Sequence, residues 1–127
     1  MKRCFTNILS ENIERSALFY ESLLGMKRHF DSDWFIILVH DELSAFEFGI
    51  LKKNHEVVTA EIRSKPGGVL VTFVVEDCNE VFRQATSLGV DILEPPTDMP
   101  YGQKRMLLRD PDGVVIDISS PTILRPL

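Results

Sequence analysis

The two halves of this chain repeat one order of expected elements, and this repetition constrains the fold more than any other feature. In each half, one β-prone run precedes a helical pattern that stops at a glycine, and further β-prone runs follow. The stretch 24–26 corresponds to 88–90, Phe5 to Leu70 and Glu47 to Asp117. Because a repeated unit usually cannot bury its sheet face alone, we expect the two units to pair.

The first half has clear signals for where its helix begins and ends. The polar stretch 10–12 offers capping side chains, apolar residues follow at helical spacing up to Leu24, and Gly25 is a natural C-terminal stop. The expected strands of this half are residues 5–9, 26–30, 34–39 and 43–50.

The second half repeats these signals. Asp77, with Glu80 three residues later, resembles a capping box, and Gly89 ends the expected helix. The expected strands are residues 69–75, 90–93, 103–108 and 114–118, with a proline-rich loop at 94–102.

The stretch from Asp110 to Gly113 reads Asp-Pro-Asp-Gly and predicts a chain reversal between the last two strands. Since side chains alternate across a strand, Ile116 and Ile118 are expected in the core, and Asp117 on the opposite face.

These elements predict a single α+β domain over residues 1–127. It consists of a first βαβββ unit at 2–51, a connection at 52–68 and a second unit at 69–120. We expect two curved mixed sheets around a cleft, with the helices on the outer face.

Composition excludes several classes of protein. The formal net charge is −5 with scattered basic residues, so no nucleic-acid partner is expected. The longest apolar run, 34–39, is too short to span a membrane, and no signal peptide is seen, so we expect a cytoplasmic protein. Cys4 and Cys78 are read as reduced thiols.

Three stretches together resemble the vicinal oxygen chelate superfamily, which includes glyoxalase I, extradiol dioxygenases and bleomycin-resistance proteins. They are residues 14–26, the second helix end at 88–90, and 110–117 with its Asp-Pro-Asp-Gly turn. The resemblance covers residues 5–119. It implies the paired βαβββ fold, which hosts several chemistries as well as binding proteins.

In the metalloenzymes of that superfamily, four ligands come from the cleft. The resemblance places them at Phe5, Glu47, Leu70 and Asp117. Two positions are apolar, so we expect neither a metal site nor another cofactor. Glu47 and Asp117 remain weak candidates for Mg²⁺ or Ca²⁺. The other interpretation of these acids is that they pair with water, or with Lys104 or Arg105.

Three further residues are candidates for lining the cleft. Tyr101 lies in the loop before the last hairpin, and Trp34 begins the expected strand 34–39 next to a turn, although Trp34 could instead pack under the first helix. Met106 would lie across from Asp117 if the hairpin turn has four loop residues.

The leading functional hypothesis is a metal-independent protein that binds a small aromatic or cationic compound. The alternative is a divalent-metal-dependent lyase, isomerase or dioxygenase, so the sequence leaves open whether the protein is an enzyme. A regulatory module without ligand chemistry is a third reading. The resemblance also implies a homodimer.

Overall fold

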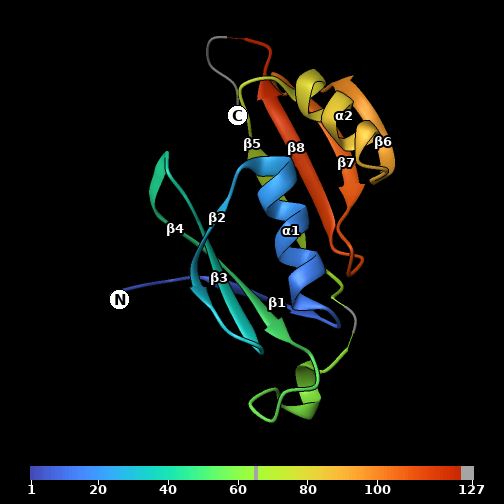
Figure 1. Cartoon of the computed structure of the whole chain (residues 1–127). Helices are drawn as coiled ribbons and strands as arrows, with labels where there is room; N and C mark the ends of the chain where they lie inside the picture. Colours follow the sequence, from blue (N-terminus) through green and yellow to red (C-terminus); the bar gives the residue numbers. More distant parts are fainter. Residues whose placement is uncertain (65, 124–127) are drawn as a thin grey trace. The chain divides into compact units, whose positions relative to one another are not determined.

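The computed structural model describes residues 1–64 and 66–123. The chain divides into two compact units, Met1–Pro66 and Gly67–Leu127. Each unit contains one α-helix and a four-stranded mixed sheet in the order βαβββ (Figure 1). The expected α+β class with two βαβββ units is therefore confirmed.

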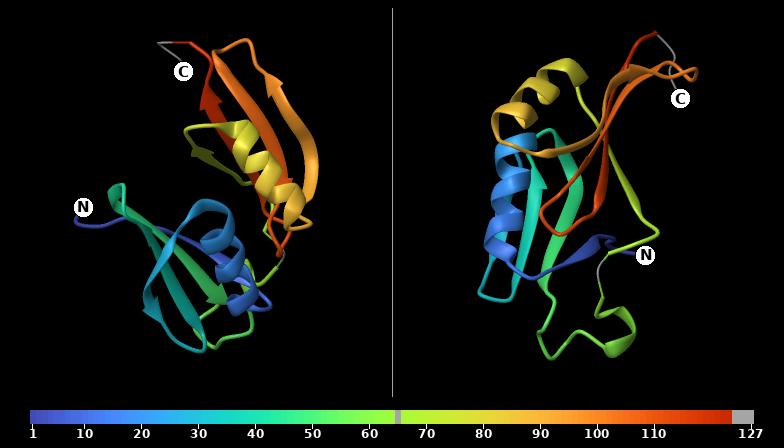
Figure 2. Two further views of the ribbon diagram at one scale, coloured as in Figure 1. Left: turned by 45° about the horizontal axis from the view of Figure 1, so that its top comes forward. Right: turned by 90° about the vertical axis from the view of Figure 1, so that its right-hand side faces the viewer.

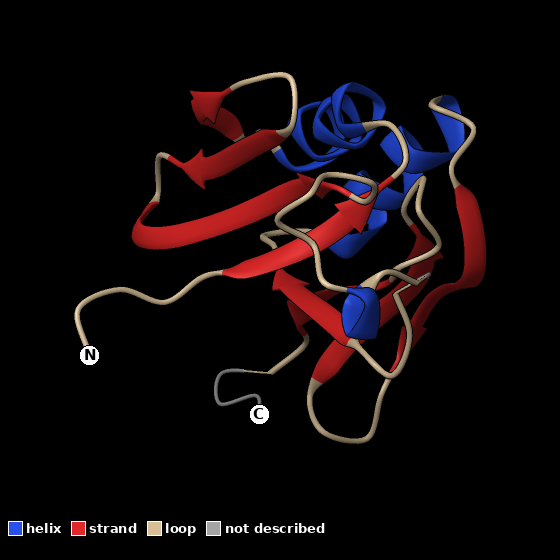
Figure 3. Ribbon diagram, turned by 90° about the horizontal axis from the view of Figure 1, so that it is seen from below, coloured by secondary structure: helices blue, strands red, loops and turns tan. Residues whose placement is uncertain are grey.

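The elements of the first unit are β1 (Thr6–Ser10), α1 (Ile13–Leu24), β2 (Lys27–Asp31), β3 (Phe35–His40) and β4 (Leu43–Lys52). The connection after β4 contains one short 3₁₀ helix, η1 (Ala60–Ile62), which is the smallest helical turn in Figure 3. The second unit contains β5 (Leu70–Val74), α2 (Cys78–Ser87), β6 (Asp91–Asp98), β7 (Gln103–Arg109) and β8 (Val115–Pro121).

The two sheets have the same topology. Their strand orders are β1-β4-β3-β2 and β5-β8-β7-β6, and in each sheet the first strand runs parallel to its neighbour while the other pairs are antiparallel. One helix lies on one face of each sheet (Figure 2). The repeat in the sequence is thus a repeat of the whole supersecondary unit.

The expected helix starts are confirmed by their caps. Asn12 accepts a hydrogen bond from the backbone N–H of Arg15 through Oδ1 (3.0 Å), and Asp77 accepts one from Asn79 (2.9 Å). These contacts satisfy backbone donors that have no partner within the first helical turn. Gly25 ends α1 in the left-handed conformation, with φ of 67°.

One expected loop is part of a strand. Residues 94–98 belong to β6, although Pro95 and Pro96 interrupt its capacity to donate backbone hydrogen bonds. Proline is tolerated here because β6 is the edge strand of its sheet and its register shifts on both sides of Glu94.

The turn of the last hairpin has one residue more than the four that would place Met106 opposite Asp117. Arg109 pairs with Val115, so residues 110–114 form the turn, and Asp110 Oδ1 accepts from the backbone N–H groups of Asp112 and Val114. Leu107 therefore lies across from Asp117, while Met106 pairs with Ile118. Because one residue of shift reverses every side chain, Met106 is in the helix-covered core instead of on the face of Asp117.

Neither α1 nor α2, nor any other helix of residues 1–64 and 66–123, is both long enough and apolar enough to cross a lipid bilayer.

Substitutions in β7 test this register. Met106 is 0% exposed, so Met106→Ala should destabilise the protein by about 2–5 kcal/mol through the cavity it leaves. Leu107→Ala, on the other face and partly exposed, should cost about 1 kcal/mol. Urea unfolding of both variants measures the difference, and a larger loss for Leu107→Ala would contradict the register.

Candidate functional site

The sheet of the first unit has one face covered by α1 and a second face, here called the distal face. Leu38, Phe48 and Ile50 lie on the helix side, where the ring of Phe48 is 4.9 Å from that of Tyr20 in α1. Strand alternation therefore places the neighbouring residues on the distal face. They include Asn7, Phe35, Glu47 and Gly49, and the ring of Phe5, just before β1, is 6.4 Å from that of Phe35.

Glu47 is held by Arg3 on this distal face. The guanidinium donates from Nε to Oε2 (2.7 Å) and from Nη2 to Oε1 (2.5 Å), so both carboxylate oxygens are engaged. The hydrogen bonds from Arg3 hold the pKa of Glu47 below its usual range, although partial desolvation opposes the shift. Within its own unit Glu47 therefore pairs with Arg3, whereas the sequence suggested Lys104 or Arg105.

Aromatic rings continue from this ion pair across the distal face. The guanidinium carbon of Arg3 is 4.8 Å from the ring centre of Phe5, which is 6.4 Å from that of Phe35. Phe30 and Trp34 are 6.0 and 5.6 Å from Phe35. We call Phe5, Phe35, Phe30 and Trp34 the aromatic row.

Trp34 stacks on a second partner in the connection that follows β4. Its ring centre is 4.3 Å from that of His55, and the two planes differ by 18°. Trp34 thus joins the aromatic row to this connection, through its contacts with Phe35 and His55.

A hollow of about 600 Å³ lies beside the Arg3–Glu47 pair. Its lining comes from the segment before β1, from β2, and from the hairpin between β3 and β4. Its lining includes Lys2, Arg3, His29, Val39, His40 and Leu43.

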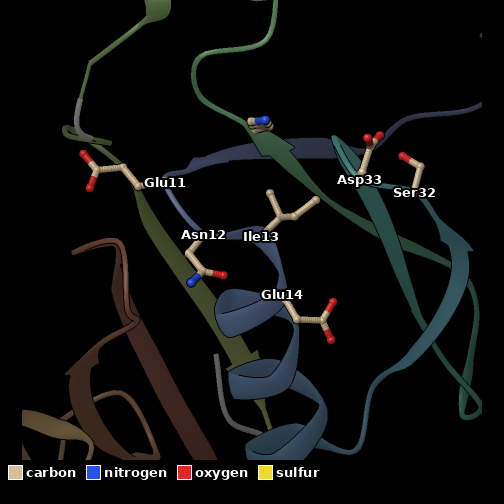
Figure 4. Close-up of a pocket in the computed structure, with 7 residues that line it drawn as sticks. Glu11, Asn12, Ile13, Glu14, Ser32 and Asp33 are labelled. Atoms are coloured by element: carbon tan, nitrogen blue, oxygen red, sulfur yellow. The ribbon is translucent and has the colours of Figure 1, made fainter.

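A second hollow, of about 290 Å³, lies at the start of α1 (Figure 4). Two of its acids have cationic partners: Glu14 binds Arg28 (2.8 Å), and Glu11 lies 3.6 Å from Lys53. Figure 4 shows Glu11 and Glu14 on opposite sides of the helix start, so these carboxylates do not converge on a common point.

In the second unit, Asp117 lies on the face of the sheet away from α2. Oδ2 accepts a hydrogen bond from Thr72 Oγ1 (3.0 Å), and Oδ1 accepts one from Ser119 Oγ (2.6 Å). Its exposed fraction is 7%. Asp117 is therefore a buried acid with a hydroxyl donor on each oxygen. Leu70 begins the adjacent strand and is largely exposed.

Strand register corrects the expected equivalence of Glu47 and Asp117. Counted back from the helix caps, Asn7 in β1 corresponds to Thr72 in β5. Their partners in the parallel pairs are Gly49 and Asp117. Gly49, two residues after Glu47, is thus the structural counterpart of Asp117. The error arose because two residues of shift leave a side chain on the same face.

Asn7 fills the space that a side chain at position 49 would need. A Cβ added to Gly49 would clash with Asn7 Oδ1 and would meet a ring carbon of Phe35 at 3.0 Å. The place that holds a carboxylate in the second unit thus holds a neutral amide in the first.

The residues at the four family positions do not fit a metal ion. Phe5, Gly49 and Leu70 offer no ligand atom from their side chains, and Asp117 is already bonded through both oxygens. Among residues 1–64 and 66–123, no group of three or more His, Cys, Asp or Glu side chains could hold a metal.

The remaining candidates from sequence lie in the second unit. Tyr101 is half-buried in the turn between β6 and β7, and no contact tests its role in binding. Met106 is removed from the site by the register described above. Sequence reasoning missed Arg3, although its position two residues before Phe5 puts both on the same face of an extended chain.

The sequence profile described as the Glyoxalase/Bleomycin resistance protein/Dioxygenase superfamily matches residues 5–118. The profile covers most of the chain, and the chain therefore belongs to this superfamily. No curated relative matches the sequence significantly.

Solved structures show the same fold. A glyoxalase/bleomycin resistance protein/dioxygenase family enzyme from Burkholderia phytofirmans PsJN is 20% identical, with a TM-score of 0.78 over 92% of this chain and 96% of that one. A superfamily member from Sphaerobacter thermophilus DSM 20745 is 23% identical, with a TM-score of 0.76 over 94% and 97%. TioX from Micromonospora sp. ML1 is 18% identical, with a TM-score of 0.71 over 95% and 99%. At these identities the likeness concerns the fold alone.

Removing the guanidinium should release the pKa of Glu47. In Arg3→Gln, the pKa of Glu47 should rise towards its ordinary value, as measured by NMR titration of the carboxyl carbon. Because the pKa is lowered in the folded state, this pair stabilises the protein above the usual carboxyl pKa and the effect is lost as pH falls through the lowered value.

Arg28→Gln is the matched control, since Arg28 lowers the pKa of Glu14 by the same kind of hydrogen bond. It should shift Glu14 and leave Glu47 unchanged. An unchanged Glu47 titration in Arg3→Gln would show that the ion pair does not set this pKa.

Proposed function

We propose that this protein binds a small aromatic molecule without a metal ion, using the distal face of its first unit. The observation that carries the proposal is that Arg3, which lines a hollow of about 600 Å³, also lies over Phe5, the first ring of the aromatic row. A ring-bearing ligand seated there could stack against fixed rings and reach the charged groups at the edge of the hollow.

The contacts of the two acids support the metal-independent part of the proposal. Glu47 is neutralised by Arg3, and Asp117 is bonded to Thr72 and Ser119. These contacts also weaken the hypothesis of a cationic ligand, because neither carboxylate is left with an oxygen that lacks a donor. Roles in binding for Leu70, Asp117 and Tyr101 stay predictions.

The superfamily name covers enzymes as well as resistance proteins, so the metal-dependent lyase, isomerase or dioxygenase remains the alternative. The expected homodimer and the cytoplasmic location also stay predictions, and the proposed binding site does not depend on either.

Elemental analysis of protein purified without chelator separates the two functions. We expect no stoichiometric metal, and titration with Mn²⁺, Ni²⁺ or Zn²⁺ should give the same weak background for wild type and for the Glu47→Gln, Asp117→Asn double variant. Tight binding near one ion per chain that the double variant loses would contradict the proposal and favour a metalloenzyme.

Trp34 is the single tryptophan and gives a direct optical test of binding. Because it stacks on Phe35, an aromatic ligand on the row should change its emission. In a screen of ring compounds that do not absorb this emission, we expect saturable changes for some of them. Phe5→Ala should weaken their binding by about fivefold, the effect of losing one aromatic contact.

Phe19→Ala is the control of the same residue type in the same unit. Phe19 is in α1, where its ring packs edge-on against Tyr20 at 5.0 Å. Its variant should bind as wild type does. Equal losses in both variants, or no saturable change with any compound, would overturn the proposed site.

A further inference from the structure

The hollow beside Glu47 carries positive charge in a chain that is acidic as a whole. Lys2 and Arg3 are the basic side chains on its wall, which the imidazoles of His29 and His40 also line. Glu47 is the acid among the lining residues, and Arg3 already compensates its charge. Since the formal net charge of the chain is −5, this local excess of cations is not a general property of its surface.

Hydrogen-bond donors remain at the hollow after these internal contacts are made. Arg3 uses Nε and Nη2 for Glu47, and its Nη1 makes no hydrogen bond within the described part of the chain. His40 accepts the backbone N–H of Glu42 at Nδ1 (3.2 Å), so Nε2 is the ring nitrogen left to donate to a ligand. Arg3 and His40, together with the ammonium of Lys2, provide donors and no competing acceptor.

The same wall has apolar parts. Val39 and Leu43 line the hollow, and Leu43 is 57% exposed although it is a large aliphatic residue. Beyond Arg3, the ring of Phe5 begins the aromatic row. An inorganic anion would leave these apolar surfaces in water, whereas a ligand with a ring and an acidic group would cover both kinds of surface.

From this combination we propose that the ligand of the hollow is a small aromatic anion, of which an aromatic carboxylate is the simplest example. The acid group lies against Lys2 and the unused donors of Arg3 and His40, and the ring lies against the apolar wall. This inference rests on the proposed function and adds the charge of the ligand to it.

Three probes of nearly the same shape test the charge. They are 2-naphthoate, 2-naphthalenemethanol and 2-naphthylmethylammonium, titrated into the full chain by calorimetry at neutral pH. We expect 2-naphthoate to bind at least about fivefold more tightly than the alcohol, as for one net charge contact, and the ammonium to bind most weakly. The preference should shrink at high salt.

Two substitutions should change the affinity for 2-naphthoate in opposite directions. Lys2→Gln removes a cation and should weaken binding by about threefold to fivefold. Glu47→Gln removes the acid and frees the guanidinium of Arg3, so it should strengthen binding. Arg15→Gln is the matched charge control, because Arg15 is exposed on α1, which covers the other face of the sheet. It should bind 2-naphthoate as wild type does.

The outcomes separate this inference from the proposed function. Equal binding of the three probes, or a preference for the ammonium, would keep the aromatic site and overturn the anionic ligand. Failure of all three probes to bind would overturn both. An effect of Arg15→Gln as large as that of Lys2→Gln would show a response to overall charge, which also rejects a built anion site.

Discussion

The covering of one face of each sheet by a single helix is the constraint on which the candidate site depends. Tyr20 packs on Phe48, and this contact fixes which side of β4 belongs to the core. Because side chains alternate along a strand, Glu47 and Gly49 lie on the distal face. Asn7 of β1 and Phe35 of β3 lie on the same face. A polar side chain on this face therefore does not disturb the packing of the core, and its contacts can serve ligand binding.

The Arg3–Glu47 pair determines what that chemistry can be. A lone carboxylate among aromatic rings would attract a cation or a metal ion, or would take up a proton. The guanidinium of Arg3 satisfies the charge of Glu47 by donating to both carboxylate oxygens, and it lies over Phe5. With Lys2 beside it, the surface changes from acidic to basic. The identity of one side chain before β1 thus changes the expected class of ligand, although it changes nothing in the fold.

Local signals were sufficient to predict most of the fold, and longer-range geometry was needed for the site. Asn12, Gly25 and Asp77 act within one turn of chain, so the sequence alone places the helices. Met106 was misplaced because the turn at 110–114 contains one more residue than that register requires, and a single residue reverses the face. Gly49 was overlooked because glycine has no side chain that could mark a functional position in the sequence. Only its pairing with Asn7 shows that it occupies the place of Asp117.

The two units show how one scaffold can keep its fold while its binding face changes. Ile50 and Ile118 are equivalent by register and both are fully buried, so the helix-covered faces solve the same packing problem. The residue before each isoleucine lies on the opposite face of its sheet. In the first unit this residue is Gly49, packed against Asn7, and in the second unit it is Asp117, which accepts hydrogen bonds from two hydroxyl groups. Packing restricts positions on the helix-covered face to apolar side chains of suitable volume. Positions on the opposite face have only to satisfy their own hydrogen bonds. Structures that share the fold at about 20% identity can therefore differ in every contact that a ligand would make, and the chemistry of this protein has to be read from its own distal face.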